Sequence, residues 1–553
     1  QGGAPLHVLF VVDCAPVGLK GGRTMSDIED SDHQDDTVIE DERAAKTTWC
    51  GGGNVDAFED DWLREYDEWG VVDEGSEVPG FGACLWNVES QGTFPATPSS
   101  GGKTLWEMLE KAVDAKGESL TVGYRELKEV HHVEEGGAIR EKLEYENEYV
   151  WLSYDEYWER VENLGSGLVG IGLRPKDMLV IYAETQMDWM VTAFATIRTS
   201  AKVVTIYATL GEEGAEHGIN QTEASTIVTD RKLLNVVAKL LPKCPSVRRV
   251  VFLGEDEPDA YTKSKIGACN VSLNGIESVI ELGKQRPVGA TPPAAQDTAV
   301  IMYTSGTTGK PKGVMISHAN IAATIAATEN VVRGAVSPDS DDVFLAYLPL
   351  AHIMGMVLEA AMLALGVKMG YGSPHTLTDT GVKLKRPESN GDAPVLKPTL
   401  MVFAPAILDK VYVGVKQKFE GLSWPLGRMA EWGIHNGKSR FDDGRIGANG
   451  FYNLIFKKVQ SLVGGKLKFA ITGSAPLSPD IQKYVQTIFS CPVRQGYGLT
   501  ETCALSCIQF FGDNSTSCVG PPASCAVIRL ADWPEGNYMN SDKDKPEIGM
   551  RRG

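Results

Sequence analysis

One short stretch of the chain, residues 304–313, is dense in groups that bind phosphate. It combines four hydroxyl side chains, three glycines and two lysines, namely Thr304, Ser305, Gly306, Thr307, Thr308, Gly309, Lys310, Lys312 and Gly313. Glycines let backbone N–H groups approach a ligand closely, hydroxyls donate hydrogen bonds, and lysines supply positive charge. The stretch therefore predicts a phosphate-binding loop. An ordinary solvated turn is the alternative, and the density of these groups disfavours it.

The apolar run before this loop and the helical pattern after it predict its place in the fold. Residues 299–303 read as a buried strand, and a helix is expected from Ser317, so we expect the loop at a strand-to-helix turn. It is not a Walker A loop, because only two residues separate Gly306 from Gly309 and Pro311 follows Lys310.

A second motif, residues 495–502, places a glycine-flanked aromatic beside a hydroxyl and a carboxylate. Tyr497 and Gly498 are followed by Thr500 and Glu501. A carboxylate of this kind suits Mg²⁺, which takes one or two carboxylates together with phosphate oxygens. Such a run taken alone is more often plain structure than a nucleotide site, but its occurrence in the same chain as the phosphate-type loop at residues 304–313 favours the nucleotide site.

Two weaker motifs also end strand candidates. Residues 471–478 contain a Gly473-Ser474-Ala475-Pro turn, a common turn composition that means little alone. Residues 347–355 contain His352 among apolar neighbours, and a lone histidine there is more often a satisfied core residue than a catalytic group.

In order and spacing, these four motifs resemble those of the adenylate-forming (AMP-binding) superfamily, which includes acyl-CoA synthetases, luciferases and the adenylation domains of peptide synthetases. The resemblance implies ATP and Mg²⁺ as cofactors and coenzyme A as co-substrate. It implies phosphate contacts for Thr304 to Lys310 and adenine contacts for Gly473, Ser474, Ala475, Tyr497 and Gly498, with Tyr497 stacking on the base. It implies catalytic roles for Lys312, Thr500, Glu501 and His352, with Glu501 as the Mg²⁺ ligand, Thr500 on the α-phosphate or substrate carboxylate, and His352 near the acyl carboxylate.

A narrower resemblance, across residues 103–553, is to eukaryotic long-chain fatty acid–CoA ligases. It rests on residues 151–154, 167–177, 207–211 and 396–401. Long-chain members often carry Glu three residues after the motif histidine, where this chain has Gly355. Two alternatives stay open: a ligase that activates another class of carboxylate, and a non-catalytic protein that binds ATP or an acyl group.

Alternation of apolar strand candidates with amphipathic helices predicts an α/β fold with largely parallel sheets. The strand candidates are residues 178–183, 203–207, 225–229, 250–253, 299–303, 344–347, 400–403 and 467–472. The resemblance adds a small β subdomain and implies that 103–553 is the adenylation large domain. Family members continue into a ribose site, a hinge and a small C-terminal domain with a catalytic lysine. Because the chain stops at Gly553, we expect that small domain to be absent. Residues 1–80, which contain an acidic run, are interpreted as a disordered tail or an uncertain gene model.

Composition narrows the function classes. The 553 residues carry a net charge of −20, which disfavours a nucleic-acid binder. The 10 cysteines include no C-x-x-C pair, which favours scattered thiols in a reducing compartment over a zinc site. The sequence contains no apolar run of about 18 residues, the length that would predict a transmembrane helix. We expect a cytoplasmic protein that binds fatty acid, ATP and coenzyme A but no nucleic acid. Peripheral association with the endoplasmic reticulum or another organelle membrane is left open.

Overall fold

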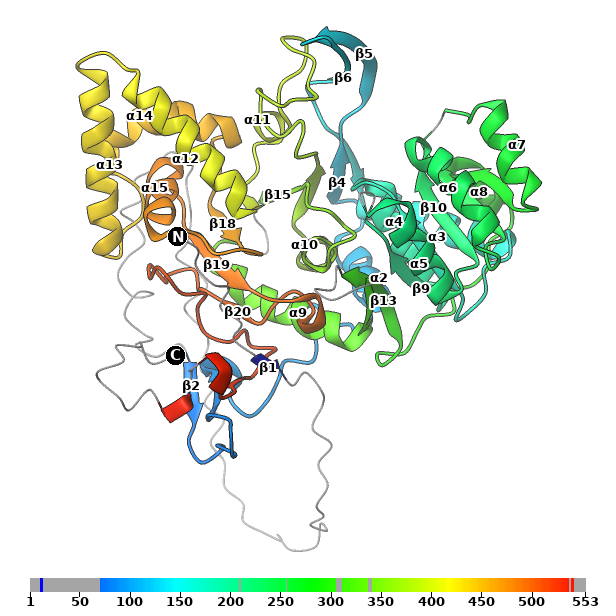
Figure 1. Ribbon diagram of the computed structural model, residues 1–553, viewed down its shortest axis with the longest axis horizontal. Coiled ribbons are helices and arrows are strands. Elements are labelled where there is room, and N and C mark those ends of the chain that lie inside the picture. Colours follow the sequence, from blue (N-terminus) through cyan, green and yellow to red (C-terminus); the bar gives the residue numbers. More distant parts are fainter. Residues whose placement is uncertain are drawn as a thin grey trace, which may run out of the picture.

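The computed structural model describes residues 70–207, 210–254, 256–304, 311–336, 341–536 and 539–541, and the backbone of 10–12. Within these residues the chain forms a seven-stranded sheet, an eight-stranded sheet, a four-stranded sheet and a two-stranded hairpin. Figure 1 shows helices α4 to α8 around the strands on its right side and helices α12 to α15 on its left.

The α-helices are α2 (Leu105–Lys116), α3 (Tyr154–Gly170), α4 (Met187–Ile197), α5 (Gly211–Thr222), α6 (Leu234–Leu240), α7 (Ala260–Ala268), α8 (Ile276–Gln285), α9 (His318–Val332), α10 (Ile353–Leu365), α11 (Asp392–Leu396), α12 (Pro405–Glu420), α13 (Leu426–Asp442), α14 (Gly450–Gln460) and α15 (Pro479–Phe489). Short 3₁₀ turns are η3 (Val88–Ser90), η4 (Arg231–Leu233), η5 (Leu241–Lys243), η6 (Ser461–Val463), η7 (Thr500–Thr502) and η8 (Pro534–Gly536).

The seven-stranded sheet has the order β12-β11-β10-β8-β9-β13-β14. Its strands are β8 (Met178–Tyr182), β9 (Lys202–Thr205), β10 (Thr226–Asp230), β11 (Arg249–Leu253), β12 (Ser272–Gly275), β13 (Thr298–Thr304) and β14 (Lys312–Ser317). All neighbours are parallel except β14, which pairs antiparallel with β13. The central strands are continuous Val and Ile runs buried on both faces, as parallel strands under two helix layers require.

The eight-stranded sheet has the order β20-β19-β18-β17-β15-β16-β4-β7. Its strands are β4 (Leu120–Tyr124), β7 (Val150–Ser153), β15 (Val343–Ala346), β16 (Lys368–Tyr371), β17 (Leu400–Phe403), β18 (Phe469–Thr472), β19 (Val493–Tyr497) and β20 (Cys507–Ile508). The inner six strands are parallel, and the edge strands β20 and β7 pair antiparallel. The prediction of largely parallel sheets covered by helices is confirmed.

Two smaller units complete the described chain. The four-stranded antiparallel sheet, in the order β1-β21-β3-β2, contains β1 (Phe10–Val12), β2 (Gly70–Asp73), β3 (Cys84–Asn87) and β21 (Ile528–Leu530). The hairpin pairs β5 (Leu127–Glu135) with β6 (Ala138–Tyr145). Strands β1 and β2 fall inside residues 1–80, and the interpretation of that segment as a tail stays a prediction.

One hydrophobic core joins the two large sheets. It contains buried residues of α2, α3, α4, α9 and α10 together with strand residues such as Val203 and Met302 from one sheet and Met369 and Leu400 from the other. Two further cores cover the outer faces, one beneath α5 and α6 and one beneath α12, α14 and α15. Helix α10 lies near the centre of Figure 1, between the two sheets.

The predicted strand-to-helix turn after residues 299–303 is wrong. The segment from Lys312 to Ser317 forms strand β14, so residues 305–311 connect two antiparallel strands, and helix α9 begins only at His318. The strand forms because Ile316 is buried in the core while Lys312 and Met315 face outward. Ser317 caps α9 by accepting a hydrogen bond from the backbone N–H of Asn320, which confirms the predicted helix start.

Candidate functional site

The two ends of the predicted phosphate loop lie opposite each other in the β13–β14 hairpin. Thr304, the last residue of β13, is paired with Lys312, the first residue of β14. Thr304 is half-buried and Lys312 is exposed, so the lysine ammonium is available at the base of the loop. The other predicted members of the loop, Ser305, Gly306, Thr307, Thr308, Gly309 and Lys310, lie outside the described residues.

Helix α5 anchors this hairpin through two side chains that the sequence did not indicate. The Nε2 atom of His217 lies 3.1 Å from the carbonyl oxygen of Pro311, and its ring meets the ring of Tyr303 edge-on at 6.1 Å between centroids. The Tyr303 hydroxyl donates to Oε1 of Gln221 over 2.7 Å. The entry and exit of the loop are therefore both fixed to one helix.

The turn motif of residues 471–478 and the second motif, residues 495–502, meet at one edge of the eight-stranded sheet. Strands β18 and β19 are parallel neighbours with Thr472 paired to Gln495, so the turn after β18 and Tyr497 at the end of β19 lie at the same carboxyl edge. Gly473 is buried, whereas Ser474 and Ala475 are exposed. Ser474 has a φ of 72°, which turns the backbone sharply and leaves an exposed surface beside the strand end.

Thr500 and Glu501 lie on the 3₁₀ turn η7, which contacts strand β14. The fold thus brings the second motif next to strand β14, although Lys312 and Glu501 are about 190 residues apart in the sequence. Glu501 is exposed, Thr500 and Tyr497 are half-buried, and burial, followed by the Cys507 thiol and the Glu501 carboxylate, raises the pKa of Tyr497. The fold therefore brings the strand that begins at Lys312 into contact with the turn that carries Glu501, which begins three residues after Tyr497 ends β19.

Gly498 has a packing role that its motif position did not reveal. A Cβ atom at this residue would lie 1.8 Å from the carbonyl oxygen of Ala504. The turn after β19 closes so tightly that no side chain fits at residue 498. The assignment of Gly498 as a cofactor contact stays a prediction, because packing alone accounts for the glycine.

His352 caps the N-terminus of α10. Its Nδ1 atom accepts a hydrogen bond from the backbone N–H of Met354 over 3.2 Å, and burial lowers the pKa of the imidazole. A neutral ring that accepts at Nδ1 carries its proton on Nε2, which leaves one donor for a ligand. Capping of α10 is therefore one structural role of His352.

The loop that carries His352 is tied to the carboxyl ends of the other sheet. Thr185, after β8, donates to the carbonyl oxygen of Leu348 over 2.8 Å and accepts from the N–H of Leu350 over 2.9 Å. Thr205, at the end of β9, donates to the carbonyl oxygen of Ala351 over 3.3 Å. Since β9 lies beside β13, His352 is held on the side of the sheet where β13 ends. Ligands of open parallel sheets bind at such carboxyl edges.

Packing around Gly355 explains why this chain lacks the glutamate that long-chain members often carry three residues after the motif histidine. A Cβ atom at Gly355 would lie 2.5 Å from the carbonyl oxygen of Pro349, so the turn excludes a glutamate there. Glu359, one turn later, is fully buried, and its Oε2 accepts from the Tyr371 hydroxyl over 2.6 Å. Burial raises the pKa of Glu359 to about 8, and the carboxyl is therefore mainly protonated at neutral pH.

Glu501 fits Mg²⁺ only together with a ligand. Within the described ranges, the one group of three carboxylate, His or Cys ligand atoms lying within 4.8 Å of one another is Glu129, His131 and Glu144 on the β5–β6 hairpin. Glu501 belongs to no such group, so a magnesium ion here would take most of its ligands from phosphate and water. This is the usual arrangement for Mg²⁺ in nucleotide sites.

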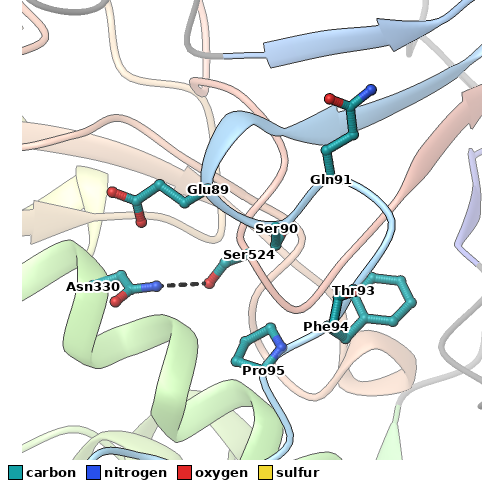
Figure 2. Close-up of a pocket in the computed structure, with 8 residues that line it drawn as sticks. All are labelled: Glu89, Ser90, Gln91, Thr93, Phe94, Pro95, Asn330 and Ser524. Atoms are coloured by element: carbon teal, nitrogen blue, oxygen red, sulfur yellow. Dashed lines mark hydrogen bonds between the residues drawn. The ribbon is translucent and has the colours of Figure 1, made fainter. Parts of the chain in front are cut away.

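A separate hollow lies between residues 89–95, helix α9 and Ser524, with a volume of about 270 Å³. Figure 2 shows its lining, in which Asn330 donates to the Ser524 hydroxyl over 3.2 Å. Among the described residues that line it, Glu89 is the single charged side chain, and none of the predicted site residues is present. A hollow without a cation, and below the usual range of about 300–1,000 Å³, does not suit a triphosphate.

Known proteins are similar to this chain in sequence and in fold. The profile of the AMP-binding enzyme family matches residues 133–551, most of the chain. The chain belongs to the AMP-binding enzyme family. Long chain acyl-CoA synthetase 8 of Arabidopsis thaliana is 36% identical over 454 residues, which cover 81% of this chain and 62% of that protein. Long-chain-fatty-acid–CoA ligase 2 of Schizosaccharomyces pombe is 30% identical over 497 residues, covering 87% of this chain and 71% of that protein.

Solved structures agree on the fold of this AMP-binding enzyme. The A domain of the carboxylic acid reductase from Segniliparus rugosus, in complex with AMP and a co-purified carboxylic acid, superimposes with a TM-score of 0.57 at 19% identity. The match covers 73% of this chain and 63% of that one. At this identity the likeness concerns the fold. The chain spans about two thirds of the length of its long-chain acyl-CoA synthetase relatives, 62% of the first and 71% of the second.

Proposed function

We propose that this protein uses ATP to activate a long-chain fatty acid as an acyl-adenylate and then transfers the acyl group to coenzyme A. The contact between strand β14, which begins at Lys312, and turn η7, which carries Glu501, is the observation that carries the proposal. This contact supports a site in which the Lys312 ammonium and a carboxylate suited to Mg²⁺, that of Glu501, bind the same polyphosphate. The names of the relatives support a fatty acid as the substrate.

In the first half-reaction, a fatty carboxylate oxygen attacks the α-phosphorus of ATP, and the bond to the leaving pyrophosphate breaks. Lys312 and the hydroxyls of residues 304–308 offset the negative charge on the phosphates, and Thr500 orients the α-phosphate or the carboxylate. Glu501 would hold Mg²⁺, which supplies further positive charge to the phosphate oxygens when bound. No side-chain nucleophile is needed, because phosphoryl transfer of this kind depends on positioning and electrostatics.

The remaining predicted residues would bind the other parts of the substrates. Tyr497 would stack on the adenine, with Gly473, Ser474 and Ala475 along the edge of the base. His352 would donate from Nε2 to the fatty carboxylate, because its Nδ1 already accepts from the backbone of Met354. In the second half-reaction, the coenzyme A thiol loses its proton to solvent and its sulfur attacks the acyl carbon, the bond from that carbon to the AMP oxygen breaks, and AMP and the thioester leave.

Pyrophosphate exchange into ATP tests the adenylation step, with a panel of acids that includes long-chain, short-chain, aryl and amino acids. We expect exchange that depends on a long-chain acid and is competed poorly by the other classes. Hydroxylamine trapping of the activated acyl group identifies the acid directly. Faster exchange with an aryl or amino acid would show that the substrate belongs to that class instead of the fatty acids. ATP binding without exchange for any acid would indicate a non-catalytic nucleotide-binding protein.

None of the helices in the described part of the chain combines the length and the hydropathy that crossing a bilayer requires. One relative, 30% identical over 462 residues, is named as a peroxisomal long chain acyl-CoA synthetase. We propose that this protein acts at the cytoplasmic surface of an organelle membrane, where long-chain fatty acids partition. Fractionation of cells that express a tagged chain tests this location.

A further inference from the structure

One helical lobe, residues 405–460, carries a third of the exposed large hydrophobic side chains of the described residues; it comprises α12, α13 and α14. Of 21 large hydrophobic side chains exposed in the described residues, seven belong to this lobe. They are Val413, Leu422, Trp424, Leu426, Trp432, Phe451 and Leu454. The lobe packs on α15 and forms the outer left part of the molecule in Figure 1, away from the seven-stranded sheet. The described chain leaves these apolar side chains uncovered, and exposed apolar patches of this kind mark interaction surfaces.

The turn between α12 and α13 carries the most exposed of these side chains. Trp424 is 83% exposed, and Leu422 and Leu426 on either side are 38% and 51% exposed. Three large apolar side chains thus protrude from one turn of five residues. Burying them in an apolar phase would be favourable in proportion to the area removed from water.

The outward faces of α13 and α14 continue this composition. On α13, Trp432 follows Arg428 by four residues, so both share the face opposite the buried Ala430 and Gly433, and the guanidinium lies 5.8 Å from the Trp432 ring centroid. On α14, residues at i, i+3 and i+7 share one face. That face carries Phe451 and Leu454, which are 64% and 57% exposed, and the exposed Lys458.

Charge in the lobe opposes that of the whole chain. Residues 405–460 contain nine Lys and Arg against five Asp and Glu, a net charge of +4 in a protein whose total is −20. Lys416 and Lys418 precede the apolar turn, Arg428 follows it, and Lys457 and Lys458 lie on α14. Basic residues around exposed tryptophans are the composition of surfaces that bind anionic membranes.

We propose that the α12–α13 turn and the outward faces of α13 and α14 dock this protein onto an anionic phospholipid bilayer. Trp424 and its neighbouring leucines insert at the level of the headgroups, and the surrounding lysines and arginines bind lipid phosphates and carboxylates. Two copies that met symmetrically through this lobe would bring like charges together, so the local positive charge favours an anionic lipid surface over a symmetric dimer through this face. Each basic group near an anionic leaflet strengthens binding, and salt weakens it within a Debye length.

This inference depends on the proposed function in one respect: it assigns a surface to the membrane association proposed there. The composition and exposure of the lobe stand without it. Binding to vesicles needs neither ATP nor catalysis, so a failure of lipid binding and a failure of adenylation are separate outcomes.

Co-sedimentation of the purified chain with vesicles tests the surface, using phosphatidylcholine alone and phosphatidylcholine mixed with phosphatidylserine. We expect binding to the mixed vesicles that falls with added salt. A Trp424→Ser and Trp432→Ser double variant should bind at least about tenfold more weakly, because two large apolar side chains no longer leave water. A Lys457→Glu and Lys458→Glu variant should lose the preference for phosphatidylserine.

Tyr261 and Lys265 on α7 provide a matched control. Tyr261 is 65% exposed, and the Lys265 ammonium lies 4.4 Å from its ring centroid, so this pair resembles Arg428 and Trp432 but lies outside the lobe. A Tyr261→Ser and Lys265→Glu variant should bind vesicles as the wild type does. Circular dichroism melts of all variants establish that the exposed substitutions leave the fold intact.

Quenching of tryptophan fluorescence by brominated lipids gives a second measurement. Vesicle-dependent quenching should fall in a Trp424→Phe variant, which keeps an aromatic ring and removes one of the 11 tryptophans. Wild-type protein that does not bind mixed vesicles would overturn the proposal, and so would a tryptophan double variant that binds them as tightly as wild type. A dimer in light scattering that disappears in that double variant, without vesicle binding, would assign the surface to a second copy and also overturn it.

Discussion

The imidazole Nε2 of His217 lies 3.1 Å from the carbonyl oxygen of Pro311, the residue immediately before Lys312. With the bond from Tyr303 to Gln221, this contact fixes both strands of the β13–β14 hairpin to helix α5. Helix α5 therefore helps to set the position of Lys312, the lysine proposed above to bind phosphate. His217 and Gln221 act as positioning residues in the proposed reaction.

Loss of this anchor should weaken nucleotide binding without changing the reacting groups. We expect His217→Ala to raise the KM for MgATP about fivefold to tenfold, with a smaller change in kcat, because the cost of ordering the hairpin is then met by ligand binding. Steady-state pyrophosphate exchange measures both constants. His217→Gln, which can donate to the Pro311 carbonyl, should recover part of the affinity. His435→Ala on α13 serves as a control with no expected effect, and equal KM values for His217→Ala and wild type would contradict the anchoring role.

Glu501→Gln should change the magnesium dependence of the same exchange. An amide is a much weaker ligand for a hard cation than a carboxylate, so the Mg²⁺ concentration for half-maximal exchange should rise, by about tenfold for a typical lost ligand. A titration of MgCl₂ at fixed ATP measures the shift. Glu110→Gln on the exposed side of α2 removes the same charge at a distance and should leave the curve unchanged. Superimposable curves for Glu501→Gln and wild type would remove Glu501 from the metal site.

Lys312→Ala, alone and with Thr307→Ala, tests the phosphate loop. The substitutions remove a cation and a hydroxyl donor from the proposed cradle, so MgATP affinity should fall by at least about tenfold in the double variant. Isothermal calorimetry measures the dissociation constant without requiring turnover. A folded double variant with wild-type affinity would show that residues 304–313 do not bind the nucleotide.

Two motif glycines should differ in their effects on stability. Gly498→Ala forces a Cβ atom to 1.8 Å from the Ala504 carbonyl, whereas at Gly473 the nearest atom, the carbonyl oxygen of Gly496, is 3.1 Å away. We expect a loss of about 3 kcal/mol in the free energy of unfolding for Gly498→Ala and under about 1 kcal/mol for Gly473→Ala. Denaturant unfolding measures both. Similar losses at the two positions would contradict the packing role of Gly498.

The buried Glu359 should make stability depend on pH. Its pKa rises from an ordinary 4.5 to about 8 in the folded protein, so the folded state keeps a proton that the unfolded state releases. That contribution is complete below pH 4.5 and is lost as the pH rises through 8. Between pH 5 and pH 8 the wild type should therefore lose on the order of 3 kcal/mol relative to Glu359→Gln, which is always neutral. Denaturant unfolding across this range measures the difference, and parallel profiles for the two proteins would contradict it.

Sequence patterns located several buried strands well because an apolar run is a local signal. The apolar run at 400–403 coincides with β17, and the run at 178–183 matches β8 to one residue. The β14 strand was missed because it lacks a continuous apolar run, with Lys312 and Met315 exposed, and because the glycine-rich stretch before it resembles the start of a helix more than a hairpin.

The residues that hold the site in place could not be predicted, because their partners are distant in the chain. His217 and Pro311 are 94 residues apart, and Thr185 and Leu348 are 163 residues apart. Neither His217 nor Thr185 belongs to a motif, so only the folded arrangement of the two sheets reveals what they contact. The same holds for Gly355 and Gly498, where backbone packing explains the glycines.

The hydrophobic core that joins the two large sheets has a practical consequence for dividing this chain. Helices α2, α3, α4, α9 and α10 contribute buried side chains to one continuous cluster with both sheets. A fragment that ends between the sheets would expose a large apolar face and would aggregate rather than fold. A cut between β14 and β15 would also leave β4 and β7 of the eight-stranded sheet in the N-terminal piece, so the two pieces would suit split-protein complementation only as a pair that folds together.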